Sequence, residues 1–198
     1  MTITAEQVKD LRDRTGAGMM ECKKALAEAA GDVATAIDLL RKAGLQKAEK
    51  RADRAADQGL VEAYIHPGNR VGVLIEVNCE TDFVARTPEF QELVRNLAMQ
   101  VAALGAEFVR REDVPAERIA KEREIYAGQV EEQKKPAAIV EKIVEGKLEK
   151  FYGEVCLLEQ PYIRDDSVKV GDLVTGLSGK TGEKMAVRRF VRFRLGQD

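Results

Sequence analysis

The spacing of apolar residues changes along the chain, from a helical period to an alternating one. In residues 1–45 apolar side chains recur three and four positions apart, which places them on one face of a helix. Residues 60–65 and 71–77 instead alternate apolar and polar side chains, which is typical of half-buried strands. Helical spacing then returns in residues 90–104. The pattern predicts an α+β fold, in which an N-terminal three-helix bundle precedes an antiparallel sheet with helices packed on it.

Three short helices are expected in residues 1–45, each bounded by a capping residue or a glycine. Helices shorter than about 12 to 15 residues are marginal in isolation, because nucleation is costly. We therefore expect these helices to pack on one another. The signals for their ends are the capping box of Thr4 and Gln7, the glycines Gly16, Gly31 and Gly44, and the cap Asp32. Residues 46–58, rich in alanine and in charges of both signs, are predicted to form a solvated helical linker.

A hairpin and a long helix are expected to form the core of the remaining chain. Residues 60–65 and 71–77 flank a short polar turn, as in an antiparallel hairpin. The apolar stripe of residues 90–104 can cover one face of that sheet. Later elements are expected as helices after Pro115 and Pro136 and over residues 168–177, a strand or tight connection over residues 151–158, and a strand over residues 185–195.

The last predicted strand is expected to have an apolar face and a basic face. Side chains of a strand alternate between the two sides of a sheet, so residues of equal parity share a side. The apolar group is Val187, Val191, Phe193 and Leu195, and the basic group is Arg188, Arg192 and Arg194. We expect the apolar group to face the core and the arginines to face water.

Length and cysteine content indicate one or two domains without a membrane span. None of the 198 residues belongs to an apolar run near the roughly 20 that a bilayer requires, and no signal-peptide pattern opens the chain. Cys22, Cys79 and Cys156 are odd in number and far apart, which favours reduced thiols over disulfides or a metal clamp. We therefore expect a cytoplasmic protein.

Charge and motifs exclude several classes of function. Lysine and arginine number 32 against 34 acidic residues, and a net charge of −2 argues against wrapping nucleic acid. His66, the one histidine, lies in a predicted turn, which argues against a serine-histidine-aspartate triad, and a multi-histidine metal site cannot form within one chain. The sequence Gly179-Lys180-Thr181 lacks the upstream glycine of a phosphate-binding loop. A binding or regulatory protein without catalytic residues, metal or cofactor is favoured.

Two groups of residues have more than one interpretation. Met19 and Met20 begin the second helix, partly off its apolar stripe. They either fill the small core or form, with Arg12 nearby, a docking patch for a partner, because methionine adapts to irregular surfaces. After the hairpin, Asp82 precedes the aromatic Phe83. Phe83 either packs in the local core, as phenylalanine usually does, or inserts into a partner as an apolar wedge.

Three long motifs closely resemble the elongation factor Ts family of bacterial translation, and the resemblance covers essentially the whole chain. The motifs are RTGAGMMECKKAL at residues 14–26, NCETDFVAR at residues 78–86 and GEVCLLEQP at residues 153–161. The resemblance implies a guanine-nucleotide exchange factor, not an enzyme, whose partner is the GTPase elongation factor Tu. Such a factor binds the partner with GDP, displaces its magnesium and promotes replacement of GDP by GTP. No cofactor and no direct contact with nucleic acid are implied.

The resemblance also implies roles for particular residues. Those that enter the magnesium and phosphate region of the partner are Thr81, Asp82, Phe83 and Val84. Those on the surface that grips the partner's nucleotide domain are Arg12, Met19 and Met20. The resemblance therefore favours the wedge for the aromatic residue and docking for the methionines.

The resemblance divides the chain into three parts. It implies a ubiquitin-associated-like three-helix domain in residues 1–45, the helical linker in residues 46–58, and an α+β core and dimerisation domain in residues 59–198. Longer members of the family carry a duplicated core half, and this chain carries one half. It is similar to the short members, which pair as homodimers.

Three other classes of function remain open from the residues alone. An adaptor for nascent chains or ubiquitin-like proteins would use the N-terminal bundle and not the loop of Asp82 and Phe83. An RNA-binding protein would use the arginines of residues 188–194, with affinity falling steeply with salt. An enzyme with an unrecognised site would turn over a small molecule with no GTPase present.

Overall fold

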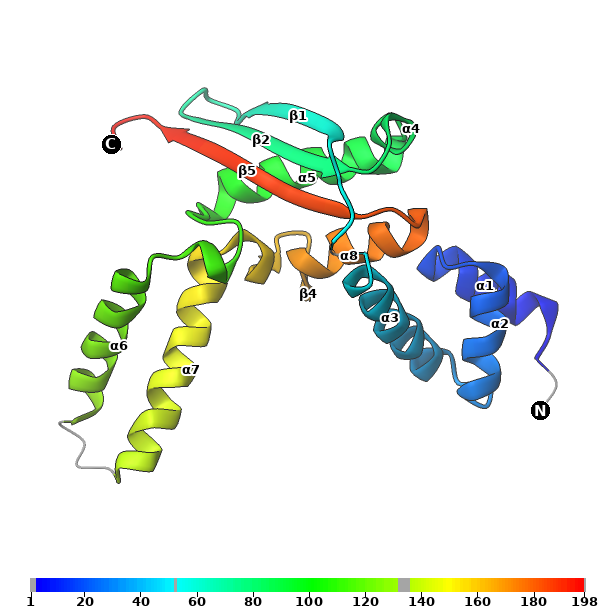
Figure 1. Cartoon of the computed structure of the whole chain (residues 1–198), viewed down its shortest axis with the longest axis horizontal. Coiled ribbons are helices and arrows are strands. Elements are labelled where there is room, and N and C mark those ends of the chain that lie inside the picture. The colour runs from blue at the N-terminus through cyan, green and yellow to red at the C-terminus, as the bar shows by residue number, and fades with distance from the viewer. Residues whose placement is uncertain (1–2, 52, 132–135, 198) are drawn as a thin grey trace. The chain divides into compact units, whose positions relative to one another are not determined.

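The computed structural model describes residues 3–51, 53–131 and 136–197, and it confirms the α+β class (Figure 1). The helices are α1 (Ala5–Thr15), α2 (Met19–Glu28), α3 (Val33–Glu49), α4 (Asp82–Ala85), α5 (Pro88–Leu104), α6 (Ala116–Glu131), α7 (Ala137–Val155) and α8 (Val170–Thr181). The strands are β1 (Gln58–Ile65), β2 (Val71–Cys79), β3 (Pro161–Tyr162), β4 (Asp165–Lys169) and β5 (Met185–Arg194). Short 3-10 turns, η1 and η2, lie at Arg111–Asp113 and Leu157–Glu159.

The chain forms two compact units, and both are assembled from segments distant in sequence. Unit 1 comprises Met1–Leu60, Val77–Leu93 and Leu173–Ala186, and unit 2 comprises Val61–Glu76, Val94–Asp172 and Val187–Asp198. The sequence predicts neither grouping, because periodicity describes one element at a time. The domain boundaries drawn at residues 45 and 58 stay a prediction. No helix in the described part of the chain is long and apolar enough to cross a membrane.

The predicted three-helix bundle, α1 to α3, lies in unit 1, and its predicted caps at Thr4, Gly16 and Asp32 form. The Thr4 hydroxyl accepts a hydrogen bond from the Gln7 amide at 3.2 Å, and the Gln7 side chain accepts one from the Thr4 amide. Gly16 ends α1 in the left-handed conformation, with φ of +67°. The Thr35 amide donates to Asp32 at 2.7 Å. Hydrogen bonding by the Thr35 side chain, and then by this amide, lowers the pKa of the Asp32 carboxyl. The small core consists of Val8, Leu11, Cys22, Ala25, Leu26, Ala29 and Ala36.

The predicted end of the third helix at Gly44 is wrong, because α3 continues to Glu49. An internal glycine costs a helix only about 1 kcal/mol, which packing can offset. Here α3 passes close to α8: a Cβ placed on Gly179 would lie 3.8 Å from the Gly44 Cα. The helical linker predicted over residues 46–58 is therefore helical only to Glu49, and β1 begins at Gln58.

The three-stranded sheet has the order β1-β2-β5, and the predicted β1–β2 hairpin is confirmed. The His66 amide donates to the Val71 carbonyl at 2.9 Å to close the hairpin turn. In unit 2 the inward face of β2 buries Val73 and Ile75, and the adjoining turns of α5 bury Leu97 and Val101. The apolar stripe of the long helix thus lies inside the fold, as its spacing predicts, except at its last residue, Leu104, which is 47% exposed.

The predicted faces of β5 are partly wrong. Val187 is buried, as predicted, but Val191 is 43% exposed and Phe193 is 71% exposed. The Arg192 guanidinium instead points inward, with Nη2 at 3.5 Å from the Ala102 carbonyl oxygen of α5. The alternation therefore shifts by one residue between Val187 and Arg192, as it does at a β-bulge. Strict alternation over ten residues could not reveal this shift.

Helices α6 and α7 run side by side as an antiparallel pair in unit 2 (Figure 1). An ion pair at 2.6 Å joins Arg123 of α6 to Glu145 of α7. Helix α7 extends to Val155, so most of residues 151–158 is helix and 3-10 turn, with one isolated bridge between Phe108 and Cys156. The helix predicted over residues 168–177 is confirmed as α8, and the small β3–β4 pair was not predicted.

A partly buried ion network fixes the turn that follows α7. Arg111 donates through Nε to Glu159 at 3.0 Å and through Nη1 to Glu149 at 3.1 Å, and its guanidinium lies 4.8 Å from the centre of the Tyr152 ring. Lys169 donates to the second Glu159 oxygen at 2.9 Å. The hydrogen bond from Arg111 is the main reason that the pKa of Glu159 is lowered.

We expect Glu159→Gln to lower the free energy of unfolding by about 1 to 2 kcal/mol at pH 7, because a partly buried carboxylate loses charged partners. The folded pKa lies below the ordinary value of 4.5, so this stabilisation is complete above 4.5 and is lost as the pH falls through the lower folded value. Urea unfolding at several pH values measures the difference.

The matched control is Glu149→Gln, since Glu149 pairs with the same arginine but its side chain is 59% exposed against 22% for Glu159. We expect this control to change the free energy of unfolding by less than about 0.5 kcal/mol. Equal losses for the two variants, or a loss from Glu159→Gln that grows as the medium becomes more acidic, would contradict this account.

Candidate functional site

Residues 81–84, the wedge turn, form the start of the one-turn helix α4 in unit 1. Thr81 is the N-cap, and its hydroxyl accepts a hydrogen bond from the Val84 amide at 3.4 Å. On the other side, the Thr87 hydroxyl donates to the Val84 carbonyl at 2.8 Å. Ala85, the next residue, is buried and holds the turn against the rest of the protein. The turn is therefore closed by hydrogen bonds at both ends.

The aromatic residue of the wedge turn points into solvent. Phe83 is 81% exposed, which is the largest exposed fraction among the exposed large apolar side chains of the described residues. The interpretation that it packs in the local core is therefore wrong. Its neighbour Asp82 forms an ion pair with Arg86 at 2.9 Å, one helical turn along, and the Asp82 side chain is about half exposed. The wedge turn presents an apolar ring beside a carboxylate.

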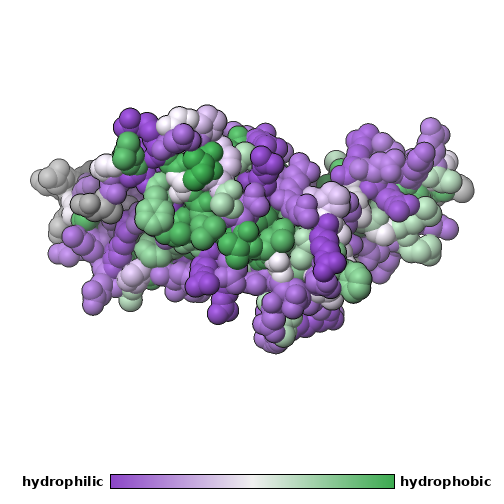
Figure 2. All heavy atoms as spheres, turned by 90° about the horizontal axis from the view of Figure 1, so that it is seen from above, coloured by the Kyte–Doolittle hydropathy of each residue, from purple (hydrophilic) through white to green (hydrophobic). Residues whose placement is uncertain are grey.

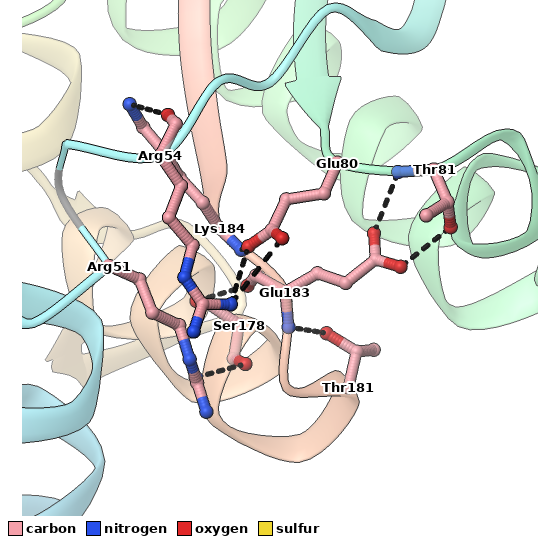
Figure 3. Close-up of polar contacts among 8 residues, drawn as sticks. All are labelled: Arg51, Arg54, Glu80, Thr81, Ser178, Thr181, Glu183 and Lys184. Carbon is pink, nitrogen blue, oxygen red and sulfur yellow. Dashed lines mark hydrogen bonds and ion pairs between the residues drawn. The ribbon is translucent and has the colours of Figure 1, made fainter.

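Glu183, in the loop between α8 and β5, holds the cap of the wedge turn (Figure 3). One carboxylate oxygen accepts from the Thr81 hydroxyl at 2.6 Å, and the other accepts from the Thr81 amide at 3.0 Å. Ser178 of α8 donates its hydroxyl to the Glu183 carbonyl at 2.5 Å. Both groups of Thr81 that can donate are thus bound by one side chain.

The neighbouring residue Glu80 forms a second connection between the same two loops (Figure 3). It accepts from the Lys184 amide at 2.5 Å and from Arg54 at 3.3 Å, while Lys184 donates through Nζ to the Arg54 carbonyl at 2.8 Å. The hydrogen bond from the Lys184 backbone is the main reason that the pKa of Glu80 is lowered. Glu80 therefore stays charged to a lower pH than an ordinary glutamate.

No pattern in the sequence indicates this polar cluster. Thr81 and Glu183 are separated by 102 positions, and Glu80 and the Lys184 amide by 104. Helical and alternating periods identify residues within one element, and they contain no information on which loops meet. The available signal was weak: charged Glu183 and Lys184 between a helix and a strand read equally well as solvated loop residues.

The cysteine beside the wedge turn is a buried thiol. Cys79 ends β2 and donates through Sγ to the Thr81 carbonyl at 3.1 Å. Burial is the main reason that its pKa is raised, with a contribution from Glu183. Cys22 and Cys156 are also free and buried, which confirms the prediction of reduced thiols.

The docking patch, defined as Arg12, Met19 and Met20, lies on the surface of the bundle. Met19 is 55% exposed and Met20 is 74% exposed at the start of α2, and Arg12 is exposed on α1. The interpretation of the methionines as core residues is therefore wrong. The turn before α2 is shaped by Gly16, where a Cβ would lie 3.0 Å from Cδ of the Lys180 side chain. Across the described residues, no group of three His, Cys, Asp or Glu side chains is arranged to hold a metal ion.

Comparisons with known proteins agree on one family. The family model described as "Elongation factor TS" matches residues 3–197. The elongation factor Ts of Carboxydothermus hydrogenoformans is 59% identical over 195 residues, which cover 98% of this chain and 90% of that protein. That of Moorella thermoacetica is 60% identical, with 98% and 96% covered, and that of Anaeromyxobacter sp. strain Fw109-5 is 56% identical, with 98% and 89% covered.

Because Phe83 makes little contact with its own molecule, we expect Phe83→Ala to change the free energy of unfolding by less than about 0.5 kcal/mol. The matched control is Phe90→Ala in α5, whose ring is completely buried, and it should cost about 3 to 5 kcal/mol. Urea unfolding of both variants measures these values. A large loss on replacing Phe83 would mean that the ring packs internally in solution.

Proposed function

This chain belongs to the elongation factor Ts family, whose members are guanine-nucleotide exchange factors for elongation factor Tu and not enzymes, and we propose that its wedge turn drives the release of GDP. In this proposal the docking patch holds the GTPase while residues 81–84 enter its magnesium and phosphate region. The observation that carries the proposal is the exposed ring of Phe83 on a turn that is hydrogen-bonded at both ends.

Exchange is a coupling between two ligands of one GTPase. If the factor weakens GDP binding by some ratio, GDP weakens binding of the factor by the same ratio. Burial of a phenylalanine side chain contributes about 1.5 to 3 kcal/mol, or roughly ten- to hundredfold in an equilibrium constant. Phe83 alone therefore accounts for a limited part of a large weakening.

Loss of magnesium coordination in the partner supplies the remainder in this proposal. A bound Mg²⁺ neutralises much of the charge on a nucleoside diphosphate, so its displacement weakens nucleotide binding strongly. Asp82 lies beside Phe83 and brings a carboxylate to the region that the ring enters. A negative charge there disturbs the balance of charges around the ion.

The docking patch contributes affinity more than exchange. Methionine side chains are flexible and adapt to an apolar surface, and Met20 is exposed enough to be covered by a partner. Arg12 on α1 is also exposed and offers a charged group, which can pair with a carboxylate of the partner. These contacts exist equally with and without nucleotide, so they lower the dissociation constant without displacing GDP.

We expect Phe83→Ala to lower the maximal rate of GDP release by roughly ten- to hundredfold, since the ring acts only in the step that displaces nucleotide. Arg12→Ala and Met20→Ala should mainly raise the factor concentration that gives half-maximal release. Stopped-flow release of a fluorescent GDP analogue from elongation factor Tu, over a range of factor concentrations, separates the two quantities. Equal losses of affinity and of maximal rate in all three variants would contradict the separate roles of the docking patch in binding and of Phe83 in GDP release.

We also propose that the protein is a homodimer formed through the outer face of its three-stranded sheet. One face of an antiparallel sheet that stands in water is usually polar. Here that face carries large apolar side chains beside the ion pair of Glu76 and Arg189, and Figure 2 shows apolar side chains gathered over the sheet and bordered by hydrophilic residues. The large exposed apolar residues of the sheet are Val61, Ile65, Leu74, Val191 and Phe193. A second copy of the same face would cover them by a two-fold axis, with residues 59–198 as the dimerisation part.

We expect Ile65→Asp to shift the protein from dimer to monomer, because a charge in an apolar interface loses its hydration. The matched control is Ile139→Asp, which changes an exposed isoleucine of α7 that lies outside the sheet. Sedimentation velocity at micromolar concentration measures the mass of each. A monomeric parent protein, or a dimer that survives in Ile65→Asp, would refute the sheet interface.

A further inference from the structure

The helix that carries the wedge turn is too short to be stable by itself. A helix of four residues, Asp82–Ala85, forms less than two full turns, and nucleation makes such a segment unfavourable without outside support. The intrinsic cap is weak, since the Val84 amide lies 3.4 Å from the Thr81 hydroxyl. The strong contacts of Thr81 are the two hydrogen bonds to Glu183, at 2.6 and 3.0 Å.

We propose that Glu183 is a positioning residue for nucleotide exchange. It fixes the backbone amide and the side-chain rotamer of Thr81, and thereby presents Phe83 in the orientation that enters the GTPase. Hydrogen bonds to a carboxylate are shorter and about twice as strong as neutral ones. This inference rests on the proposed function, in which residues 81–84 displace the magnesium of the partner.

The position of Glu183 is itself fixed by the end of α8. The Ser178 hydroxyl donates to the Glu183 carbonyl at 2.5 Å, and the Glu183 amide donates to the Thr181 hydroxyl at 3.4 Å. Gly182, with φ of +80°, makes the turn between Thr181 and Glu183 in a conformation that favours glycine. The carboxylate is thus held by a helix end on one side and aims at Thr81 on the other (Figure 3).

A pre-ordered wedge turn matters because disorder lowers the population of the competent conformation. If only a fraction of the molecules adopts that conformation, the rate of the step that needs it falls by the same fraction. Docking by Arg12, Met19 and Met20 does not involve the turn. Loss of Glu183 should therefore lower the maximal rate of GDP release and leave the affinity of docking almost unchanged.

The test uses the full-length protein with Glu183→Ala, Thr81→Val and the double variant, in the stopped-flow assay of GDP release from elongation factor Tu. We expect Glu183→Ala to lower the maximal rate about tenfold, since the Thr81 hydroxyl and the Thr81 amide each lose a hydrogen bond to a charged group. Thr81→Val removes the hydroxyl and keeps the amide, so a smaller loss is expected. The double variant should be no slower than Glu183→Ala, because both changes remove one shared interaction.

Two further variants keep the test specific. Thr81→Ser retains the hydroxyl and should exchange nucleotide at the parent rate. Glu89→Ala removes a different glutamate of unit 1, whose partner is Lys180 at 3.5 Å, and should also leave the maximal rate unchanged. A fall in docking affinity equal to the fall in rate for Glu183→Ala would assign Glu183 a structural role only, and overturn the inference.

Phe83→Ala, assayed in parallel, separates failure of this inference from failure of the proposed function. Slow release with Phe83→Ala and parent release with Glu183→Ala would keep the wedge and overturn the positioning role. Parent release with both variants would overturn the wedge and, with it, the positioning role. Slow release with both, at unchanged docking affinity, is the result that we expect.

Discussion

The wedge turn depends on one constraint: a single turn of helix must be held from outside. Its own cap is a long hydrogen bond, and its aromatic side chain contributes no packing because it points into solvent. The stabilising contacts come from a loop 102 positions later, through the carboxylate of Glu183. The neighbouring pair of Glu80 and the Lys184 amide fastens the same two loops a second time. The exposed residues of the turn are therefore free to contact a partner, because the stability of the fold does not depend on them.

In this molecule exposed apolar side chains are available for binding, while hydrogen bonds of the backbone hold the elements that carry them. Met20, Phe83 and Phe193 are among the most exposed large apolar residues that the structure describes, and each lies on an element fixed by other residues. Solvent exposure of such groups is unfavourable, and association removes it. An exchange factor has to bind its GTPase and then leave when nucleotide returns. In the proposed function the affinity is divided between two small surfaces, the docking patch and the wedge turn, which suits that cycle.

Much of the fold follows from local signals in the sequence. The capping box at Thr4, the left-handed Gly16 and the cap Asp32 act within one turn of chain, so their residues suffice to predict them. The end of α3 is not predicted because Gly179 of α8 approaches the Gly44 backbone only in the folded chain. The faces of β5 are not predicted because one shift in alternation reverses every later side chain. The exposure of Phe83 followed from the family resemblance and not from periodicity. The role of Glu183 could not be predicted from the sequence, since no local pattern indicates which loops lie in contact.

The long separation between the two halves of the wedge-turn site also sets an order of events during synthesis. Residues 78–86 leave the ribosome well before residues 178–184, so the early chain carries Phe83 on a segment that lacks its support. Contacts of such sequence separation form late in folding, because loop closure has to come first. The last stretch, β5, must also be added before the sheet is complete. A chain that is still being translated therefore lacks the carboxylate of Glu183, and its wedge turn is held by fewer hydrogen bonds than in the full-length protein.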